Sequence, residues 1–189
     1  MQAMLQVQNK DFAAAEATLK QFATAAQANA ADPANIPGMT QAYLLHAQIA
    51  ETQGDFETAE SWLQRVDNPA DVFNAQIRRA ALWARQGELT RARGLLHTLQ
   101  AASAEEDRIK WMAEVQFLRD AGKYTEALAT LATPVEADFE PLLLETKGDV
   151  YAAEGKNSEA VAAYEQALNK LPKEAGNRQL LQLKADQLK

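Results

Sequence analysis

Two histidines have the strongest potential for catalysis or metal binding in this chain. His46 and His97 lie far apart in the sequence, and neither has a group of carboxylates around it. A metal centre or a catalytic triad needs several side chains that converge on one point. The 189 residues include no cysteine, so no thiolate can complete such a site. We interpret both histidines as ordinary helix residues, and we expect no metal ion.

Paired acids are the second kind of group that can do chemistry, as general acid and general base. The densest acidic run is Glu105-Glu106-Asp107, which follows Ser103. A serine followed three residues later by a glutamate is a capping box, and negative charge is favourable at a helix N-terminus. Helix capping therefore explains these acids. Because no glycine-rich phosphate loop follows a predicted strand either, the sequence predicts no catalytic residue, no cofactor and no enzyme activity.

The sharpest chemical feature is a group of arginines with Glu88 as the only acid between them. Guanidinium groups bind carboxylates through two parallel hydrogen bonds, so an acidic peptide or a chain terminus is a suitable partner. The alternative is a solvent-exposed face on which the arginines pair with nearby acids. The group consists of Arg78, Arg79, Arg85, Arg91 and Arg93.

The overall composition limits the class of protein. Hydrophobic residues make up 47% of the chain, charged residues make up 24%, and the formal net charge is −7. These values exclude a wholly disordered chain, and the acidic balance argues against a nucleic-acid partner. No apolar run approaches the ~18 residues of a membrane-spanning helix, so we expect no direct membrane insertion. The first residues have the pattern of a helix end and no signal-peptide pattern, which favours a piece of a longer protein.

The elements that position these groups come from an internal repeat. A short motif recurs as QGDFETA, QGELTRA, AGKYTEA and EGKNSEA, with glycines at positions 54, 87, 122 and 155. A fifth copy, NKDFAAA, has Lys10 in place of the glycine, so that successive copies lie 44, 33, 35 and 33 residues apart. Three of these intervals fit a helix–turn–helix repeat of about 34 residues. The extra residues of the first interval fall in a loop around Pro33 and Pro37.

Each recurring residue has a physical role. The glycine ends the first helix of a pair in a left-handed conformation, and the alanine five residues later lets the second helix approach closely. We predict an all-α solenoid with about eleven helices and no sheet, forming a single domain over 1–189. The repeats are expected at about 1–30, 39–68, 70–102, 104–134 and 138–171. A capping helix at 175–188, with Leu180, Leu181, Ala185 and Leu188 on one stripe, would cover the last apolar face.

These motifs resemble the tetratricopeptide repeat (TPR) family over nearly the whole chain. Asn157 departs from the family pattern, because an aromatic residue usually stands there. In the three repeats before the last, Ala47, Ala80 and Val115 replace the equivalent of Gly148. The resemblance implies a right-handed α-solenoid of about five helix pairs that acts as a non-enzymatic scaffold for protein–protein interaction. The last repeat matches the family pattern at Leu144, Gly148, Tyr151, Gly155, Ala160, Tyr164, Ala167 and Pro172.

The same resemblance implies where a ligand would bind, because the first helix of each pair lines the concave groove in TPR arrays. Three arginines are our candidates for holding an acidic peptide, and three amide side chains are candidates for adaptable hydrogen bonding. The lysine–asparagine clamp by which some TPR domains hold chaperone tails is absent from these positions, which argues against that partner. The six expected groove residues are Arg78, Arg85, Arg119, Gln48, Asn74 and Gln116.

Residues 120–188 carry a narrower resemblance. The segments AGKYTEALATL, PVEADFEPLLLETKGDVYAAEGKNSEAVAAYEQAL and LLQLKADQLK are similar to the C-terminal part of the YfgM-like family of ancillary SecYEG translocon subunits. Members of that family have one N-terminal membrane anchor and a periplasmic TPR domain that binds chaperones and translocon components. The resemblance implies such a partner at the periplasmic face of a bacterial inner membrane, with the cytoplasm as the alternative location. The first ~100 residues are more similar to the repeat arrays of long bacterial TPR proteins.

A second function from a different class stays open. The chain is alternatively a structural or self-associating repeat array, designed or recombined, with no dedicated ligand. An incomplete first repeat would leave an apolar N-terminal edge through which two copies form a homodimer. The large aromatic residues fit packing between helices, although one on the concave face would instead anchor a peptide. These aromatic residues are Tyr43, Trp62, Trp83, Trp111 and Tyr124.

Overall fold

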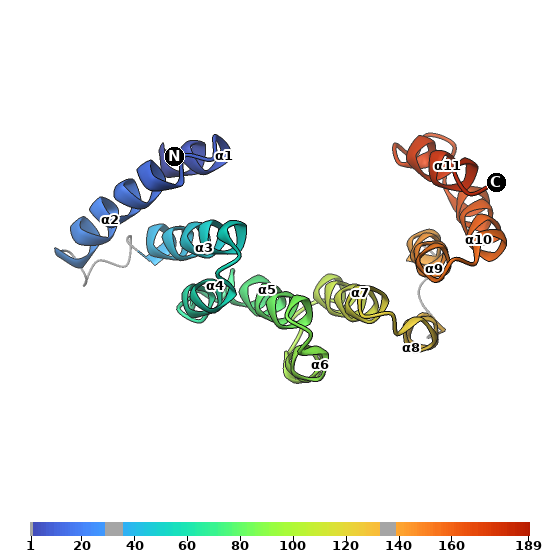
Figure 1. Ribbon diagram of the computed structural model, residues 1–189, viewed down its shortest axis with the longest axis horizontal. Helices are drawn as coiled ribbons and strands as arrows, with labels where there is room; N and C mark the ends of the chain where they lie inside the picture. The colour runs from blue at the N-terminus through green and yellow to red at the C-terminus, as the bar shows by residue number, and fades with distance from the viewer. Residues whose placement is uncertain (1, 29–35, 133–138) are drawn as a thin grey trace. The chain divides into compact units, whose positions relative to one another are not determined.

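The computed structural model describes residues 2–28, 36–132 and 139–189. These residues form eleven α-helices and no strand, which confirms the predicted all-α fold (Figure 1). Of the loop expected around Pro33 and Pro37, Pro33 lies outside the described residues. The expectation is wrong at Pro37, which is the second residue of the helix Ile36–Gln53, because proline is tolerated in the first turn of a helix. The helices are α1 (Gln2–Gln8), α2 (Phe12–Ala28), α3 (Ile36–Gln53), α4 (Phe56–Leu63), α5 (Val72–Arg85), α6 (Leu89–Thr98), α7 (Ala104–Asp120), α8 (Tyr124–Thr130), α9 (Glu140–Glu154), α10 (Asn157–Lys170) and α11 (Arg178–Asp186).

The chain divides into two compact units, Met1–Asp107 and Arg108–Lys189. The first unit contains α1 to α6 and the first residues of α7, and the second contains the rest of α7 and α8 to α11. The predicted single solenoid over 1–189 stays a prediction. The expected capping helix at 175–188 corresponds to α11, which packs against α10.

A residue in the left-handed conformation ends the first helix of each pair, as the repeated motif predicts. The φ angles are 78° at Gly54, 83° at Gly87, 71° at Gly122 and 81° at Gly155. Lys10 adopts the same conformation, with φ of 60°. A residue with a side chain disfavours this conformation by roughly 1–2 kcal/mol. The first turn therefore has the same geometry as the others, although Lys10 is less suited to it than glycine.

The alanine that follows each turn by five residues is completely buried. Nothing of these five side chains is exposed to solvent, and each lies on the second helix of its pair. A larger residue would push the second helix away from the first, because protein interiors are packed too tightly to absorb extra methylene groups. The alanines are Ala15, Ala59, Ala92, Ala127 and Ala160.

The core of the first unit consists of two apolar clusters that share α3. Ile49 of α3 packs with Val7 of α1 and Leu19 of α2. Ala47, on the same helix, packs with Leu63 of α4 and Leu82 of α5. The first helix α3 is therefore buried against its own partner and against the preceding pair, which is how repeats that cannot bury an apolar face alone become stable.

The core of the second unit forms where α9, α10 and α11 meet. Leu144 of α9, Tyr164 of α10 and Leu181 of α11 belong to one buried cluster. The Tyr164 ring lies directly on Gly148, where a Cβ atom would overlap it. The Tyr164 hydroxyl donates a 2.7 Å hydrogen bond to Asp149 Oδ1, so the ring is fixed at both ends.

We expect Gly148→Ala to destabilise the second unit. The added methyl group displaces the Tyr164 ring and weakens its hydrogen bond, so the free energy of unfolding should fall by about 1–3 kcal/mol. Urea unfolding followed by circular dichroism measures this change. Gly94→Ala in α6 is the matched control: no atom lies within 4 Å of the added Cβ there, and helix propensity should raise stability by up to about 1 kcal/mol. Equal stability of the two variants would contradict the close contact at Gly148.

Candidate functional site

The six expected groove residues fall into two groups, one in each unit. Gln48 of α3 and Asn74 and Arg85 of α5 are exposed, whereas Arg78 of α5 is half-buried; these four belong to the first unit. In the second unit, Gln116 of α7 is exposed and Arg119 of the same helix is half-buried.

Arg78 is engaged by a neighbouring repeat. Its Nη2 atom lies 2.7 Å from Glu51 Oε1 on α3, and the two side chains keep 34% and 24% of their surface exposed. The ion pair joins two consecutive first helices. Arg78 therefore already has a carboxylate, and an acidic ligand would have to share it with Glu51.

Arg85 is more available to a ligand than Arg78, the other expected groove arginine of the first unit. Its guanidinium lies over the Phe56 ring of α4, 4.7 Å from the ring centre, and the residue is exposed. Within the described parts of the chain, no carboxylate forms an ion pair with it. The stacking on Phe56 restricts the guanidinium but does not neutralise its charge.

Arg119 is paired with its own neighbour in the second unit. Its Nε and Nη2 atoms lie 2.9 and 2.8 Å from Asp120 Oδ1. Both groups are partly exposed, with 29% of the Arg119 side chain and 57% of the Asp120 side chain accessible. Exposed pairs of this kind contribute little to stability, so a stronger acidic ligand can displace Asp120.

Two further arginines of the group, Arg79 and Arg91, pair with a glutamate that lies outside the arginine-rich segment. Glu60 of α4 accepts from Arg79 Nη2 at 3.1 Å and from the indole Nε1 of Trp83 at 2.8 Å. Arg91 of α6 approaches the same carboxylate at 3.4 Å and lies 3.8 Å from the centre of the Trp83 ring. Arg91 also pairs with Glu88 at 3.0 Å. The arginine group is therefore largely part of a structural network that joins α4, α5 and α6.

Burial alone would raise the pKa of Glu60, because it disfavours the charged form. The hydrogen bonds from Trp83, Arg79 and Gln64 and the charge of Arg91 outweigh burial, so the pKa of Glu60 lies below its ordinary value. Glu60 is thus a fixed negative charge at neutral pH.

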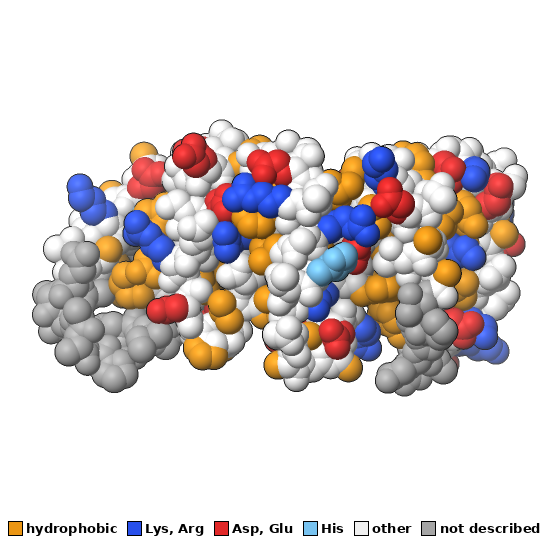
Figure 2. All heavy atoms as spheres, turned by 90° about the horizontal axis from the view of Figure 1, so that it is seen from below, with side chains coloured by type: hydrophobic (Ala, Val, Ile, Leu, Met, Phe, Trp, Pro, Cys, Tyr) orange, Lys and Arg blue, Asp and Glu red, His pale blue; other side chains and the backbone are white. Residues whose placement is uncertain are grey.

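Positive and negative side chains are also mixed on the surface. Figure 2 shows one face on which Lys and Arg side chains are interspersed with Asp and Glu side chains.

One available signal predicts these partners. With a period of 33 residues between the second and third motifs, α5 should neighbour the helices of the preceding repeat. Two acids of that repeat, Glu51 and Glu60, lie 27 and 19 residues before Arg78 and Arg79. Counting acids only between the arginines finds Glu88 and misses both of these carboxylates.

The second unit contains a polar cluster that was also missed. Lys184 Nζ of α11 lies 2.8 Å from Glu145 Oε1 and 2.9 Å from Asp149 Oδ1, both on α9. Burial lowers the pKa of Lys184, but its bonds to these two carboxylates outweigh burial and the net shift is upward. Burial and the bond to Asp149 raise the pKa of Tyr164 as well. The cluster fastens α11 to α9, and both upward shifts keep Lys184 charged and Tyr164 neutral at neutral pH.

The large aromatics behave mainly as packing residues. Trp83 is 6% exposed, and Trp62 packs half-buried against the core cluster of α3, α4 and α5. His46 stacks on Trp62 with ring centres 4.3 Å apart, and Tyr43 stacks on it at 5.9 Å. Burial lowers the pKa of His46, which is therefore neutral at pH 7. In the second unit the Trp111 indole donates to the Thr130 carbonyl at 3.2 Å.

The described residues contain neither a cluster of metal ligands nor a membrane-spanning helix. Across 2–28, 36–132 and 139–189, no group of three or more His, Cys, Asp or Glu residues is placed to hold a metal ion. None of the helices in those ranges has the length and apolar character needed to cross a bilayer.

Comparison with known proteins gives two kinds of match. Residues 72–189 match the profile of a tetratricopeptide repeat-like domain, and residues 1–72 match that of a tetratricopeptide repeat. A curated protein of Neisseria gonorrhoeae (strain ATCC 700825 / FA 1090), the "Ancillary SecYEG translocon subunit", is 63% identical over 67 residues. The matched stretch is 35% of this chain and 32% of the relative, so the chain spans about a third of that protein's length.

We expect Glu60→Ala to destabilise the first unit by about 2–4 kcal/mol. The change leaves Arg79 largely buried without its carboxylate and the Trp83 indole without an acceptor, and such losses are costly in a poorly hydrated site. Urea unfolding monitored by circular dichroism provides the measurement. Glu88→Ala removes an exposed pair with Arg91 and should cost less than about 1 kcal/mol. A Glu60 variant no less stable than the Glu88 variant would show that the network contributes nothing beyond surface charge.

Proposed function

Because the chain belongs to the tetratricopeptide repeat family, we propose that it is a protein-interaction scaffold without catalytic activity. It binds a peptide or a partner protein along the first helices of its repeats, which form the concave groove in this family. The observation that carries the proposal is Arg85, an exposed cation on a first helix that stacks on Phe56. Helix pairs that are rigid before binding lose little conformational freedom, so the ordering cost falls on the ligand.

The chemistry of the exposed groups favours an acidic segment as the ligand. Arg85 offers parallel donors that fit a carboxylate, and the amides of Gln48 and Asn74 are exposed on α3 and α5 of the same unit. Arg78 joins this set only by sharing Glu51. In the second unit, Arg119 and Gln116 provide the corresponding groups on α7.

The proposed partner is the translocon or a protein bound to it. Support comes from the 63% identity over 67 residues to a protein named as an ancillary SecYEG subunit. A translocon partner implies association with the bacterial inner membrane, and we propose its periplasmic face.

Binding to purified SecYEG in lipid nanodiscs tests this proposal, with affinity measured by biolayer interferometry. Arg85→Glu should weaken binding about tenfold or more, as expected for the loss of one charge-assisted contact. Lys20→Glu is the matched control, because it makes the same charge change at an exposed residue of α2, a second helix, and should leave the affinity unchanged.

The two outcomes separate the parts of the proposal. Absence of any binding by the unaltered chain would reject SecYEG as the partner. Equal binding by the Arg85 and Lys20 variants would show that Arg85 does not contact the ligand, while SecYEG would remain the partner.

A second candidate function is self-association through the N-terminal edge. Met4 and Leu5 of α1 keep 41% and 54% of their surface exposed, although both are large and apolar. Two copies that pair through α1 would bury these side chains in an isologous homodimer.

Light scattering coupled to size-exclusion chromatography tests this candidate. The chain should change from dimer to monomer on dilution, and Leu5→Glu should give a monomer at every concentration because a charge would be buried at the contact. Leu183→Glu, at an exposed leucine of α11, is the control and should leave the dimer intact. A monomer at all concentrations for the unaltered chain would reject the homodimer.

A further inference from the structure

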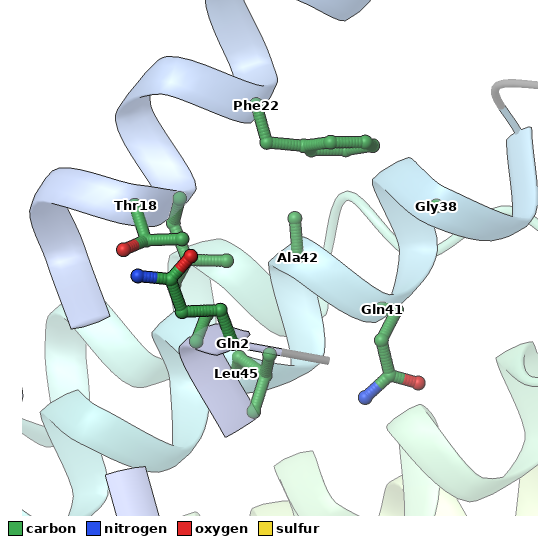
Figure 3. Close-up of a pocket in the computed structure, with 9 residues that line it drawn as sticks. Gln2, Thr18, Phe22, Gly38, Gln41, Ala42 and Leu45 are labelled. Atoms are coloured by element: carbon green, nitrogen blue, oxygen red, sulfur yellow. The ribbon is translucent and has the colours of Figure 1, made fainter. Parts of the chain in front are cut away.

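A cleft of about 290 Å³ opens between α1, α2 and α3 of the first unit. Its walls are mostly apolar, and three polar side chains, Gln2, Thr18 and Gln41, stand at its border. Figure 3 shows the Phe22 ring projecting over Ala42 toward the turn of α3 that carries Gly38. The apolar part of the lining consists of Ala3, Leu19, Phe22, Gly38, Ala42 and Leu45.

Around this cleft, the first two repeats correspond in sequence at a constant offset of 44 residues. Asp11 and Asp55 each accept a hydrogen bond from the backbone amide three residues later, at 3.2 and 3.1 Å. Phe12 and Phe56 then begin the second helices, α2 and α4. Counting from these common starts, Thr18 is the seventh residue of α2, and the seventh residue of α4 is Trp62.

The two equivalent residues differ greatly in size. Trp62 packs against the core cluster of α3, α4 and α5 and stacks on His46 and Tyr43. Thr18 instead lies within hydrogen-bond distance of Gln6 Oε1, at 2.9 Å, and of its own helix at the Ala14 carbonyl, at 3.0 Å. His46 corresponds to Gln2 by the same offset of 44 residues. The first repeat therefore lacks the aromatic stack that fills this place in the second.

We propose that the cleft binds an aromatic side chain of a partner protein, in the place where the second repeat carries its own. The volume is sufficient, because a cavity of about 150 Å³ already accepts a benzene ring. Phe22 provides a ring wall and is 37% exposed, which is unusual for a side chain held against the backbone of Gly38. An aromatic guest covers this ring and gains the stacking that Trp62 obtains from His46.

The border of the cleft suits a peptide better than a free hydrocarbon. Gln2 and Gln41 are exposed amides that donate to and accept from a backbone on either side of the aromatic residue. The ligand is thus an apolar segment with a tryptophan or phenylalanine at its centre. This site uses none of the arginines assigned to the groove, and it stands or fails independently of them.

N-acetyl-L-tryptophanamide is the probe, because it combines an indole with two amide groups. Titration into the full chain, followed by two-dimensional NMR, should shift the Gly38 backbone amide and the Gln41 side-chain amide with a dissociation constant of about 1 mM or tighter. N-acetyl-L-alaninamide should produce no such shifts. Absence of shifts at Gly38 and Gln41 with the tryptophan derivative would overturn the proposal.

Two variants connect binding to the cleft itself. Thr18→Trp restores the missing side chain, so the variant should melt at a higher temperature and bind the probe at least tenfold more weakly. Thr24→Trp, at an exposed residue of α2 outside the lining, is the matched control and should bind like the unaltered chain. If Thr18→Trp fails to fold, Phe22→Ala is the second variant. Removing this partly exposed ring should preserve the fold and weaken the binding of the probe. Unchanged affinity in the folded cleft variant would overturn the proposal.

Discussion

The close approach of the two helices in each pair is the constraint on which the rest of the molecule depends. The approach is possible because a small residue stands at the crossing: a completely buried alanine on the second helix. In the last pair, Gly148 adds a second small residue, which gives the Tyr164 ring its place on the first helix. The left-handed residue at each turn directs the chain back at the required angle. The positions of the groove side chains on the first helices therefore depend on these helix crossings.

Two arginines of α5 form ion pairs with acids of the preceding repeat. Arg78 and Arg79 on α5 both reach back to carboxylates of the preceding pair, Glu51 on α3 and Glu60 on α4. These bonds have two effects: they fix how consecutive pairs meet, and they remove two positive charges from the surface. Arg85 then differs from its neighbours through its aromatic support and its exposure. A cluster that looks uniform in sequence thus contains residues with different tasks.

The fold was predictable because its signals are local. Gly54 and Ala59 lie five residues apart, and each records a requirement of one turn or one crossing. The candidate site was predictable only in outline, because the partners of the arginines lie about one repeat away and belong to other helices. Repeat alignment rewards agreement between copies, whereas the cleft at Thr18 arises from a disagreement between them. The expected groove residues therefore stay predictions, and the cleft was found only in the structure.

The short turns also determine the order in which the structure can assemble. α3 and α4 are separated by two residues, Gly54 and Asp55, so the loop that must close to form the pair carries almost no entropic cost. Contacts of such low sequence separation form quickly and early in folding. The ties from Lys184 to Glu145 and Asp149 bridge 39 and 35 residues and need a finished α9 and α10 before they can form. The apolar face of α9 and α10 that α11 covers therefore stays open until α11 has been synthesised and has docked.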